Sequence, residues 1–277
     1  MKHTTLRVLA DQFDAFFIDQ FGVLMDATGA YPFAIDSVKR LSELGKPMIL
    51  LSNSGKRALK NEERLTRLGF EVCLFTKVIT SGEVAYSVIK KNIQKKFPKK
   101  PNVFIISRDS DTSPIDDLNC DVCDRIEKAD FIIISGSEPE KHSLQFYHNL
   151  LKPAVDRNIP AFCINPDMIM LTKTGTSFGA GAIAKEYEKL GGNLSWFGKP
   201  YEEIYNFALK FIPEILPQKV LCIGDSPEHD IRGGYFANCK TALVRSGIHS
   251  KSSFQELVEG LADSDRADFV IPNFSFV

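Results

Sequence analysis

The chain has 277 residues, a formal net charge of −1 and a hydrophobic content of 44%, which is typical of an ordinary soluble globular protein. The near-neutral charge gives no electrostatic reason to bind nucleic acid or an anionic membrane. No apolar run approaches the length of a membrane span. No secretion signal is visible, so we expect a cytoplasmic protein.

The first strong structural signal is the apolar run at residues 15–18, which reads Ala-Phe-Phe-Ile. Such a run predicts a strand buried on both faces of a parallel sheet. Asp19 follows the strand directly, and Gly22 permits a turn just beyond it. Open α/β sheets bind ligands at this end of their strands, although a strand-end aspartate is also a common turn cap. Asp19 is therefore the first candidate functional residue.

The segments that follow alternate between helical and strand patterns. A helix is predicted at 33–44 and ends at Gly45, and another is predicted at about 58–68. Strands are predicted at 47–51, ahead of Ser52 and Asn53, and within 70–79, ahead of a capping box formed by Thr80 and Glu83. The order β-α-β-α-β predicts a parallel sheet with right-handed crossovers.

The composition changes near residue 90, where six lysines lie between residues 90 and 100. Aromatic interleaving is missing, so a solvated linker flank is a better interpretation than a nucleic-acid patch. Strands predicted at 103–107, 131–134 and 161–164, with a helix at about 140–157, indicate a second α/β unit. Cys120 and Cys123 within it have zinc or redox spacing, but no second pair follows, and we interpret the spacing as coincidence.

The last third returns to the first pattern. The glycine-rich residues 175–181 lack the order and the preceding strand of a dinucleotide loop, so they predict a helix entrance. Helices are predicted at 180–190, 201–211 and 231–237, and strands at 219–223, 241–244 and 268–272. The expected fold is a doubly wound parallel α/β sheet. The expected domains are a core at residues 1–90 and 174–277 and an inserted α/β domain at 91–173.

Polar side chains follow several predicted parallel strands at the same edge of the sheet. They are Asp19, Ser52, Lys199 in a Gly-Lys-Pro loop, and Asp225 with Asp230 five residues later. Converging carboxylates suit Mg²⁺, which takes one or two protein carboxylates and leaves room for phosphate oxygens. A lysine and a hydroxyl beside them suit phosphate, and a carboxylate nucleophile can form an aspartyl-phosphate. Helix capping explains a single strand-end aspartate or serine, and surface exposure explains a single lysine. Neither explains all of these residues together in this order.

With these residues the sequence resembles the haloacid dehalogenase (HAD) superfamily, and most closely its type IIA branch of sugar-phosphate, nucleotide and 4-nitrophenyl phosphatases. Four stretches match the family's motifs I to IV in order: residues 19–24 (Asp-Gln-Phe-Gly-Val-Leu), 50–53 (Leu-Leu-Ser-Asn), 198–200 (Gly-Lys-Pro), and Gly224-Asp225 with Asp230. The resemblance covers almost the whole chain. It implies a Rossmann-like HAD core with an inserted C2 cap that closes over the core.

The resemblance implies a nucleophile and a metal site. Asp19 is expected to attack phosphorus and to bind Mg²⁺. The backbone carbonyl of Phe21 is expected to supply another metal oxygen, Asp225 the second carboxylate, and Asp230 support from farther out.

The resemblance also implies a phosphate site and a substrate site. Ser52 and Lys199 are expected to hold the phosphoryl oxygens, while Asn53 shapes the phosphate loop. Asn165 and Asp167 lie where the family places the substrate-specificity loop of the cap, although an Asn-Pro-Asp turn is also common in bare loops.

One residue departs from the family pattern. Most family phosphatases carry a second aspartate two residues after the nucleophile, which protonates the leaving alcohol, whereas this chain has Phe21. General acid help is typically worth about 10²–10⁴-fold in rate, so its loss affects poor leaving groups most. Three explanations follow. The enzyme acts on substrates with good leaving groups, or another group such as Asp26, His229 or a cap residue donates the proton. The third is that the protein binds a phosphorylated ligand without efficient turnover.

The function we expect is therefore a Mg²⁺-dependent phosphatase of small phosphorylated metabolites that forms an aspartyl-phosphate at Asp19. The alternative is a HAD protein that binds a phosphorylated ligand, or regulates through it, with little turnover. Neither nucleic acid nor membrane is an expected partner. The resemblance also admits a homodimer formed through the cap.

Overall fold

The computed structural model describes residues 1–97, 99–172, 175–247 and 260–276, which form two compact units. The core unit comprises Met1–Ser52, Leu59–Ile79 and Lys199–Val277, and the inserted unit comprises Asn53–Ala58 and Thr80–Gly198. In these described ranges, no helix has the length and apolar character needed to cross a membrane.

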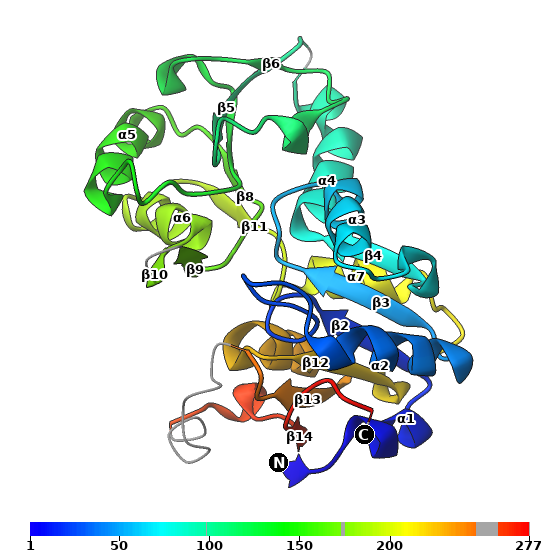
Figure 1. Cartoon of the computed structure of the whole chain (residues 1–277). Coiled ribbons are helices and arrows are strands. Elements are labelled where there is room, and N and C mark those ends of the chain that lie inside the picture. The colour runs from blue at the N-terminus through cyan, green and yellow to red at the C-terminus, as the bar shows by residue number, and fades with distance from the viewer. Residues whose placement is uncertain (98, 173–174, 248–259, 277) are drawn as a thin grey trace. The chain divides into compact units, whose positions relative to one another are not determined.

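The core unit is built on a seven-stranded sheet with the order β1-β14-β13-β12-β2-β3-β4 (Figure 1). The pairings from β1 through to β3 are all parallel. The strands are β1 (Lys2–His3), β2 (Ala15–Asp19), β3 (Met48–Ser52), β4 (Lys77–Thr80), β12 (Val220–Gly224), β13 (Lys240–Val244) and β14 (Phe269–Ile271). Its helices are α1 (Leu6–Gln12), α2 (Pro32–Glu43), α7 (Glu202–Leu209) and α8 (Arg232–Phe236), together with α3 (Ala58–Arg67), whose first residue belongs to the inserted unit.

Helices cover both faces of this sheet, as the buried strands predict. Successive side chains of a strand point to opposite faces. Phe16 and Ile18 of β2 join the buried cluster that includes Val38 of α2. On the opposite face, the backbone of α8 lies so close that a Cβ on Gly234 would be 3.0 Å from the Cβ of Cys222. The predicted doubly wound α/β fold is confirmed.

The direction of winding reverses between β2 and β12. From β2 the chain adds β3 and then β4 on one side, whereas β12, β13 and β14 lie on the other side. Open α/β sheets bind ligands at such a switch point, in the crevice beyond the carboxyl ends of the strands. The fold therefore places the ends of β2 and β12 where a ligand site is expected.

The inserted unit contains a second parallel sheet, with the order β11-β8-β7-β5-β6. An antiparallel pair, β9 with β10, lies outside this sheet. The strands are β5 (Asn102–Ile106), β6 (Asp121–Val122), β7 (Phe131–Ile134), β8 (Ala161–Cys163), β9 (Ile169–Thr172), β10 (Gly175–Phe178) and β11 (Leu194–Trp196), and the helices are α4 (Ser81–Lys96), α5 (Leu144–Asp156) and α6 (Ala180–Lys189).

The predicted domain boundaries at residues 90 and 173 differ from the limits of the inserted unit. The predicted boundary at residue 90 followed the lysine-rich composition. Helix α4 instead continues to Lys96, and its lysines are exposed. At the other end, Ile183 and Tyr187 of α6 are fully buried in the core of the inserted unit. The chain returns from the inserted unit to the core unit at Lys199, shortly after β11, which pairs with β8 of the inserted sheet.

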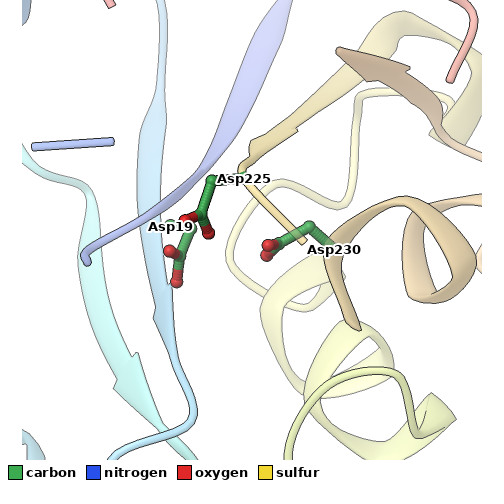
Figure 2. A group of neighbouring side chains, drawn as sticks. All are labelled: Asp19, Asp225 and Asp230. Atoms are coloured by element: carbon green, nitrogen blue, oxygen red, sulfur yellow. The ribbon is translucent and has the colours of Figure 1, made fainter. Parts of the chain in front are cut away.

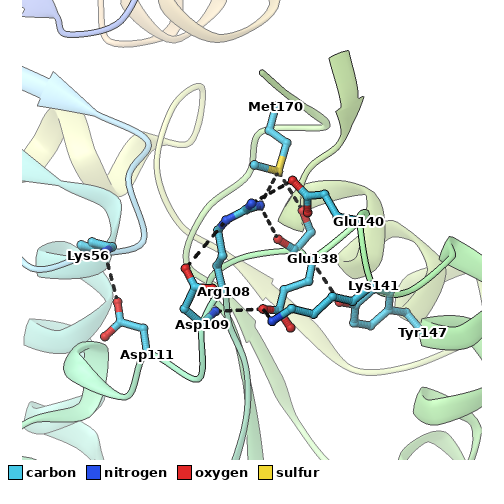
Figure 3. Close-up of polar contacts among 10 residues, drawn as sticks. Lys56, Arg108, Asp109, Asp111, Glu138, Glu140, Lys141, Tyr147 and Met170 are labelled. Carbon is cyan, nitrogen blue, oxygen red and sulfur yellow. Dashed lines mark hydrogen bonds and ion pairs between the residues drawn. The ribbon is translucent and has the colours of Figure 1, made fainter. Parts of the chain in front are cut away.

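Charged side chains at the carboxyl ends of β5 and β7 neutralise one another (Figure 3). Arg108 donates to Glu140 Oε1 at 2.8 Å, and the Asp109 backbone N–H donates to Glu138 Oε1 at 3.0 Å. Lys141 also donates to Glu138, at 2.6 Å. Each exposed cation in this cluster has a carboxylate partner, so the cluster is explained as a surface ion-pair network.

Candidate active site

The predicted site residues of the core unit gather at the carboxyl edge of its sheet. Asp19 is the last residue of β2, Ser52 is the last residue of β3, and Asp225 directly follows β12. These three strands are neighbours in the parallel sheet, so their ends share one edge. Asp230 reaches the same place from a single π-helical turn, Pro227–Ile231.

Three carboxylates form a compact acidic group at this edge (Figure 2). Oxygens of Asp19, Asp225 and Asp230 all lie within 4.8 Å of one another. Asp225 is 6% exposed and Asp230 is 4% exposed. Among the described residues, this is the one group of three or more acidic, histidine or cysteine side chains placed to share a metal ion.

Lys199 is the cation that joins two of these carboxylates. Lys199 is 3% exposed, and its ammonium donates to Asp19 Oδ1 and, at 2.6 Å, to Asp230 Oδ1. Burial alone would lower the pKa of Lys199, but the charges of Asp19 and Asp230 raise it above its ordinary value. Lys199 is therefore a permanently charged ammonium at neutral pH.

The acidic group carries more negative charge than Lys199 can neutralise. Burial raises the pKa of Asp19 well above its ordinary value, and repulsion from Asp230 and Asp225 adds to the effect, while the charge of Lys199 opposes it. With all three carboxylates ionised, one ammonium would leave two negative charges unbalanced, and a divalent cation would offset them. Hard cations bind such oxygen ligands, so the residues fit a divalent metal site.

Two glycines leave the space that the Asp225 carboxylate occupies. A Cβ on Gly22 would lie 2.0 Å from Asp225 Oδ2, and a Cβ on Gly247 would lie 1.8 Å from the same atom. Gly22 also has a φ of +82°, which favours glycine. The Ser246 hydroxyl donates to the Gly22 carbonyl at 2.8 Å and so holds the two loops together.

Replacing Gly247 by Ala is expected to displace the Asp225 carboxylate. Because the new methyl group would overlap Asp225, we expect a loss of about 1–3 kcal/mol in the free energy of unfolding. The stabilisation that a divalent cation gives should also fall. Thermal unfolding with and without the cation measures both effects. As a control, Gly45→Ala strains a φ of +68° in open space and should lower stability without changing the response to the cation. An unchanged cation response in Gly247→Ala would contradict this role.

The predicted substrate residues of the inserted unit also lie together. Asn53 is 6% exposed and donates from Nδ2 to Asp167 Oδ1 at 2.8 Å. The Asp167 backbone N–H donates to Asn165 Oδ1 at 3.2 Å. Asn53 directly follows Ser52, the last residue of β3. One hydrogen bond therefore connects the Asn-Pro-Asp turn to the residue next to Ser52. Their substrate contacts stay predictions.

Two residues proposed as replacement proton donors differ in their surroundings. The Asp26 carboxylate accepts from the Thr28 hydroxyl at 2.6 Å and from the Thr28 backbone N–H at 2.7 Å. These hydrogen bonds lower the pKa of Asp26, so it is ionised at neutral pH and is poorly suited to donate a proton. His229 is half-buried in the π-helical turn, and its backbone N–H donates to Ser226 Oγ at 3.2 Å.

Gly247 and Ser246 were not predicted from the sequence. They follow β13, which lies beside β12 in the sheet, and the rule that parallel strand ends share an edge would have found them. Their residue types carry no catalytic signal, and the order of the strands was needed to place them.

The fold and this site define a doubly wound α/β protein with an acidic, lysine-containing ligand site at its switch point. A family model described as haloacid dehalogenase-like hydrolase matches residues 16–121, and a second, described as HAD-hydrolase-like, matches residues 196–275. The chain belongs to the haloacid dehalogenase-like hydrolases. The superfamily predicted from the motifs is confirmed.

Solved structures and one curated protein extend the comparison. A haloacid dehalogenase-like hydrolase from Brucella suis is 24% identical with a TM-score of 0.82, and 98% of each chain is covered. A p-nitrophenyl phosphatase from Archaeoglobus fulgidus is 23% identical with a TM-score of 0.73, covering 95% of this chain and 97% of that one. Phosphoglycolate phosphatase 2 from Arabidopsis thaliana is 21% identical over 285 residues, covering 91% of this chain and 89% of that protein. These comparisons support the predicted enzyme class, a HAD-type phosphoric monoester hydrolase.

Proposed function

We propose that this hydrolase is a Mg²⁺-dependent phosphatase of small phosphorylated metabolites that forms an aspartyl-phosphate at Asp19. The observation that carries the proposal is the buried group of Asp19, Asp225, Asp230 and Lys199 at the switch point of the sheet. Carboxylates for a hard cation and an ammonium for phosphate are the main groups that phosphoryl transfer requires.

Asp19 and Asp225, with the backbone carbonyl of Phe21, are the groups that would hold Mg²⁺. The excess negative charge of the cluster and the space beside Asp225 support this assignment. Bound there, the cation would supply positive charge to the phosphoryl oxygens and orient the phosphate. Asp230 acts from farther out, because its Oδ1 accepts from Lys199 and its Oδ2 accepts from the Ser226 backbone N–H at 3.1 Å.

In the proposed reaction, a carboxylate oxygen of Asp19 bonds to phosphorus as the bond from phosphorus to the leaving oxygen breaks. The leaving group departs as an alcohol after gaining a proton, or directly as a stable anion. A water oxygen then bonds to phosphorus and loses its proton, and the bond to Asp19 breaks. This second step releases inorganic phosphate and restores the carboxylate.

Lys199 and Ser52 are the proposed ligands of the phosphoryl oxygens. Lys199 is held by Asp19 and Asp230, so its position is fixed before a substrate binds. Asn53 is proposed to shape the phosphate loop, and Asn165 with Asp167 to select the substrate. The hydrogen bond from Asn53 to Asp167 supports a coupling of these last roles.

Phe21 supports the second candidate, a protein that binds a phosphorylated ligand with little turnover. Phe21 is 40% exposed, and its ring carries no proton that could be donated. The lowered pKa of Asp26 removes one replacement. The retained carboxylates and Lys199 would still bind phosphate and metal.

Phe21 also predicts a bias toward good leaving groups. We expect turnover of acetyl phosphate and 4-nitrophenyl phosphate to exceed that of glucose 6-phosphate, because a sugar alkoxide needs a proton and the other two groups do not. Phe21→Asp should raise the rate on glucose 6-phosphate at least about tenfold while changing the rate on acetyl phosphate little. Phe21→Leu is the matched control, since it changes the ring but adds no acid.

The experiment that tests the proposed function is phosphate release from these three compounds, with Mg²⁺ and with a chelator. Mg²⁺-dependent turnover biased to the first two supports the phosphatase and the missing acid together. Brisk hydrolysis of glucose 6-phosphate by the native protein would show that another group donates the proton. Binding of phosphate without turnover of any compound would favour the binding protein.

Two further expectations accompany the proposal. All six cysteines are free thiols, which supports a reducing compartment such as the cytoplasm. Pairing of two copies through the inserted unit stays a prediction, and the mass in solution tests it.

A further inference from the structure

Arg64 is a half-buried guanidinium with no acidic partner among the described residues. It lies on α3, and its Cζ is 5.6 Å from the centroid of the Phe21 ring. A cation over an aromatic face is held by the negative charge of the ring face. This contact with Phe21 fixes the guanidinium but does not neutralise it.

The helix itself offers Arg64 no counter-charge. Residues three and four positions away lie on the same helical face, and for Arg64 these are Lys60, Asn61, Arg67 and Leu68. Lys60 pairs instead with Glu63, at 3.3 Å. Burial lowers the pKa of Arg64, and repulsion from Arg67 lowers it further.

Three other arginines of the chain show the usual arrangement. Arg57 pairs with a carboxylate at 2.7 Å, Arg108 at 2.8 Å and Arg232 at 2.6 Å, with Glu83, Glu140 and Asp265 as their respective partners. The pair of Arg108 is visible in Figure 3. A partly desolvated cation without such a partner is unfavourable. An arginine kept in that state beside a ligand site is suited to an anion that arrives with the ligand.

Arg64 is connected to the loop after Asp19 through its contact with the Phe21 ring. Phe21 is two residues beyond Asp19, so their Cα atoms are at most about 7 Å apart. Phe21 is 40% exposed, and the Arg64 guanidinium lies over the face of its ring. A substrate that extends from a phosphate at Asp19 across the exposed side chain of Phe21 would meet the Arg64 guanidinium.

We propose that Arg64, positioned on the ring of Phe21, binds a second anionic group of the substrate. The substrate class is then a phosphorylated small molecule that carries a carboxylate or another negative group besides the reacting phosphate. This inference rests on the proposed phosphatase function. In this proposal Phe21 cannot donate a proton, but its ring holds the Arg64 guanidinium in place.

Matched probes that differ only in charge test the inference. The short pair is 2-phosphoglycolate and glycolamide phosphate, and the long pair is 3-carboxyphenyl phosphate and 3-carbamoylphenyl phosphate. In the native protein we expect kcat/KM to favour the carboxylate over the amide in at least one pair. Arg64→Gln should lower kcat/KM for that carboxylate by about 10- to 100-fold and for the amide by less than about threefold.

Two variants separate charge from structure. Arg64→Lys should recover part of the preference, because it keeps the charge but loses the planar fork. Arg67→Gln removes an exposed cation from the same helix and should leave the preference unchanged. Equal losses on carboxylate and amide in Arg64→Gln, or no loss at all, would overturn the inference.

Calorimetric binding of the same probes to Asp19→Asn with Mg²⁺ gives a readout that does not depend on turnover. A carboxylate preference that Arg64→Gln removes would support the anion site even if the native protein hydrolyses none of the four probes, which would count against the phosphatase instead. Binding with no carboxylate preference, alongside turnover of 4-nitrophenyl phosphate, would overturn the anion site and leave the phosphatase standing.

Discussion

Asp19→Asn is expected to lower turnover of every phosphate ester by at least about 10⁴-fold, because an amide cannot attack phosphorus to form an acyl phosphate. The substitution keeps the shape of the side chain. Lys199 retains Asp230 as its partner, so the site should remain assembled. Phosphate release from acetyl phosphate and 4-nitrophenyl phosphate with Mg²⁺ measures the effect.

Asp19→Asn should not destabilise the protein in the absence of a cation. Burial raises the pKa of Asp19, so its contribution to stability is full below the ordinary carboxyl pKa and is lost as pH rises through the raised value. Ionisation of the buried Asp19 carboxylate therefore opposes folding, and the amide carries no such charge. The control is Asp36→Asn, which alters an exposed carboxylate paired with Arg40 and should keep turnover within about twofold. Substantial turnover by Asp19→Asn would mean that another group attacks phosphorus.

Lys199→Met is expected to damage both stability and turnover. Methionine keeps an unbranched apolar stem like that of lysine but lacks the ammonium, so Asp19 and Asp230 lose their shared cation in a buried place. Breaking a buried ion pair by removing one partner typically costs about 3–5 kcal/mol. Loss of a preorganised charge at the phosphoryl oxygens should lower kcat by about 10²–10³-fold.

The loss of stability in Lys199→Met should depend on pH. Without the ammonium, the pKa of Asp19 rises further, so the variant is least impaired in acid, where the carboxyl is protonated, and loses stability as pH rises. Urea unfolding at several pH values measures this trend. Lys240→Met removes an exposed lysine paired with Asp268 at 2.7 Å and should cost less than about 1 kcal/mol at every pH. A pH-independent loss in Lys199→Met would indicate a packing defect instead.

Strand ends were the part of this molecule that sequence reasoning predicted well. Asp19, Ser52 and Asp225 each follow a short apolar run, and parallel strands necessarily bring such positions to one edge. The doubly wound fold followed from the same alternation of strands and helices. Lys199 and Asp230 were predicted as members of the same set, and the structure adds that one ammonium joins Asp230 to Asp19.

Contacts between segments that are far apart in the chain could not be predicted from the sequence. The predicted domain boundary near residue 90 followed a lysine-rich composition that resembles a linker, whereas the exposed lysines at 90, 91, 95 and 96 belong to the continuous helix α4. Strands β10 and β11 are three or four residues long and lack a continuous apolar run, and the apolar run within β9 is only three residues long. Arg64 and Phe21 are far apart in the chain, and only the packing of α3 against the loop after β2 brings them together.

Trapping the phosphorylated enzyme tests the central proposal most directly. The protein is mixed with Mg²⁺ and acetyl phosphate, quenched in acid and reduced with borohydride, which converts an aspartyl-phosphate to homoserine. Peptide mass analysis then locates the modified residue. We predict homoserine at position 19, absent when Mg²⁺ is chelated and absent in Asp19→Asn. Turnover of acetyl phosphate with no modification at position 19, or with modification at another carboxylate, would contradict the account.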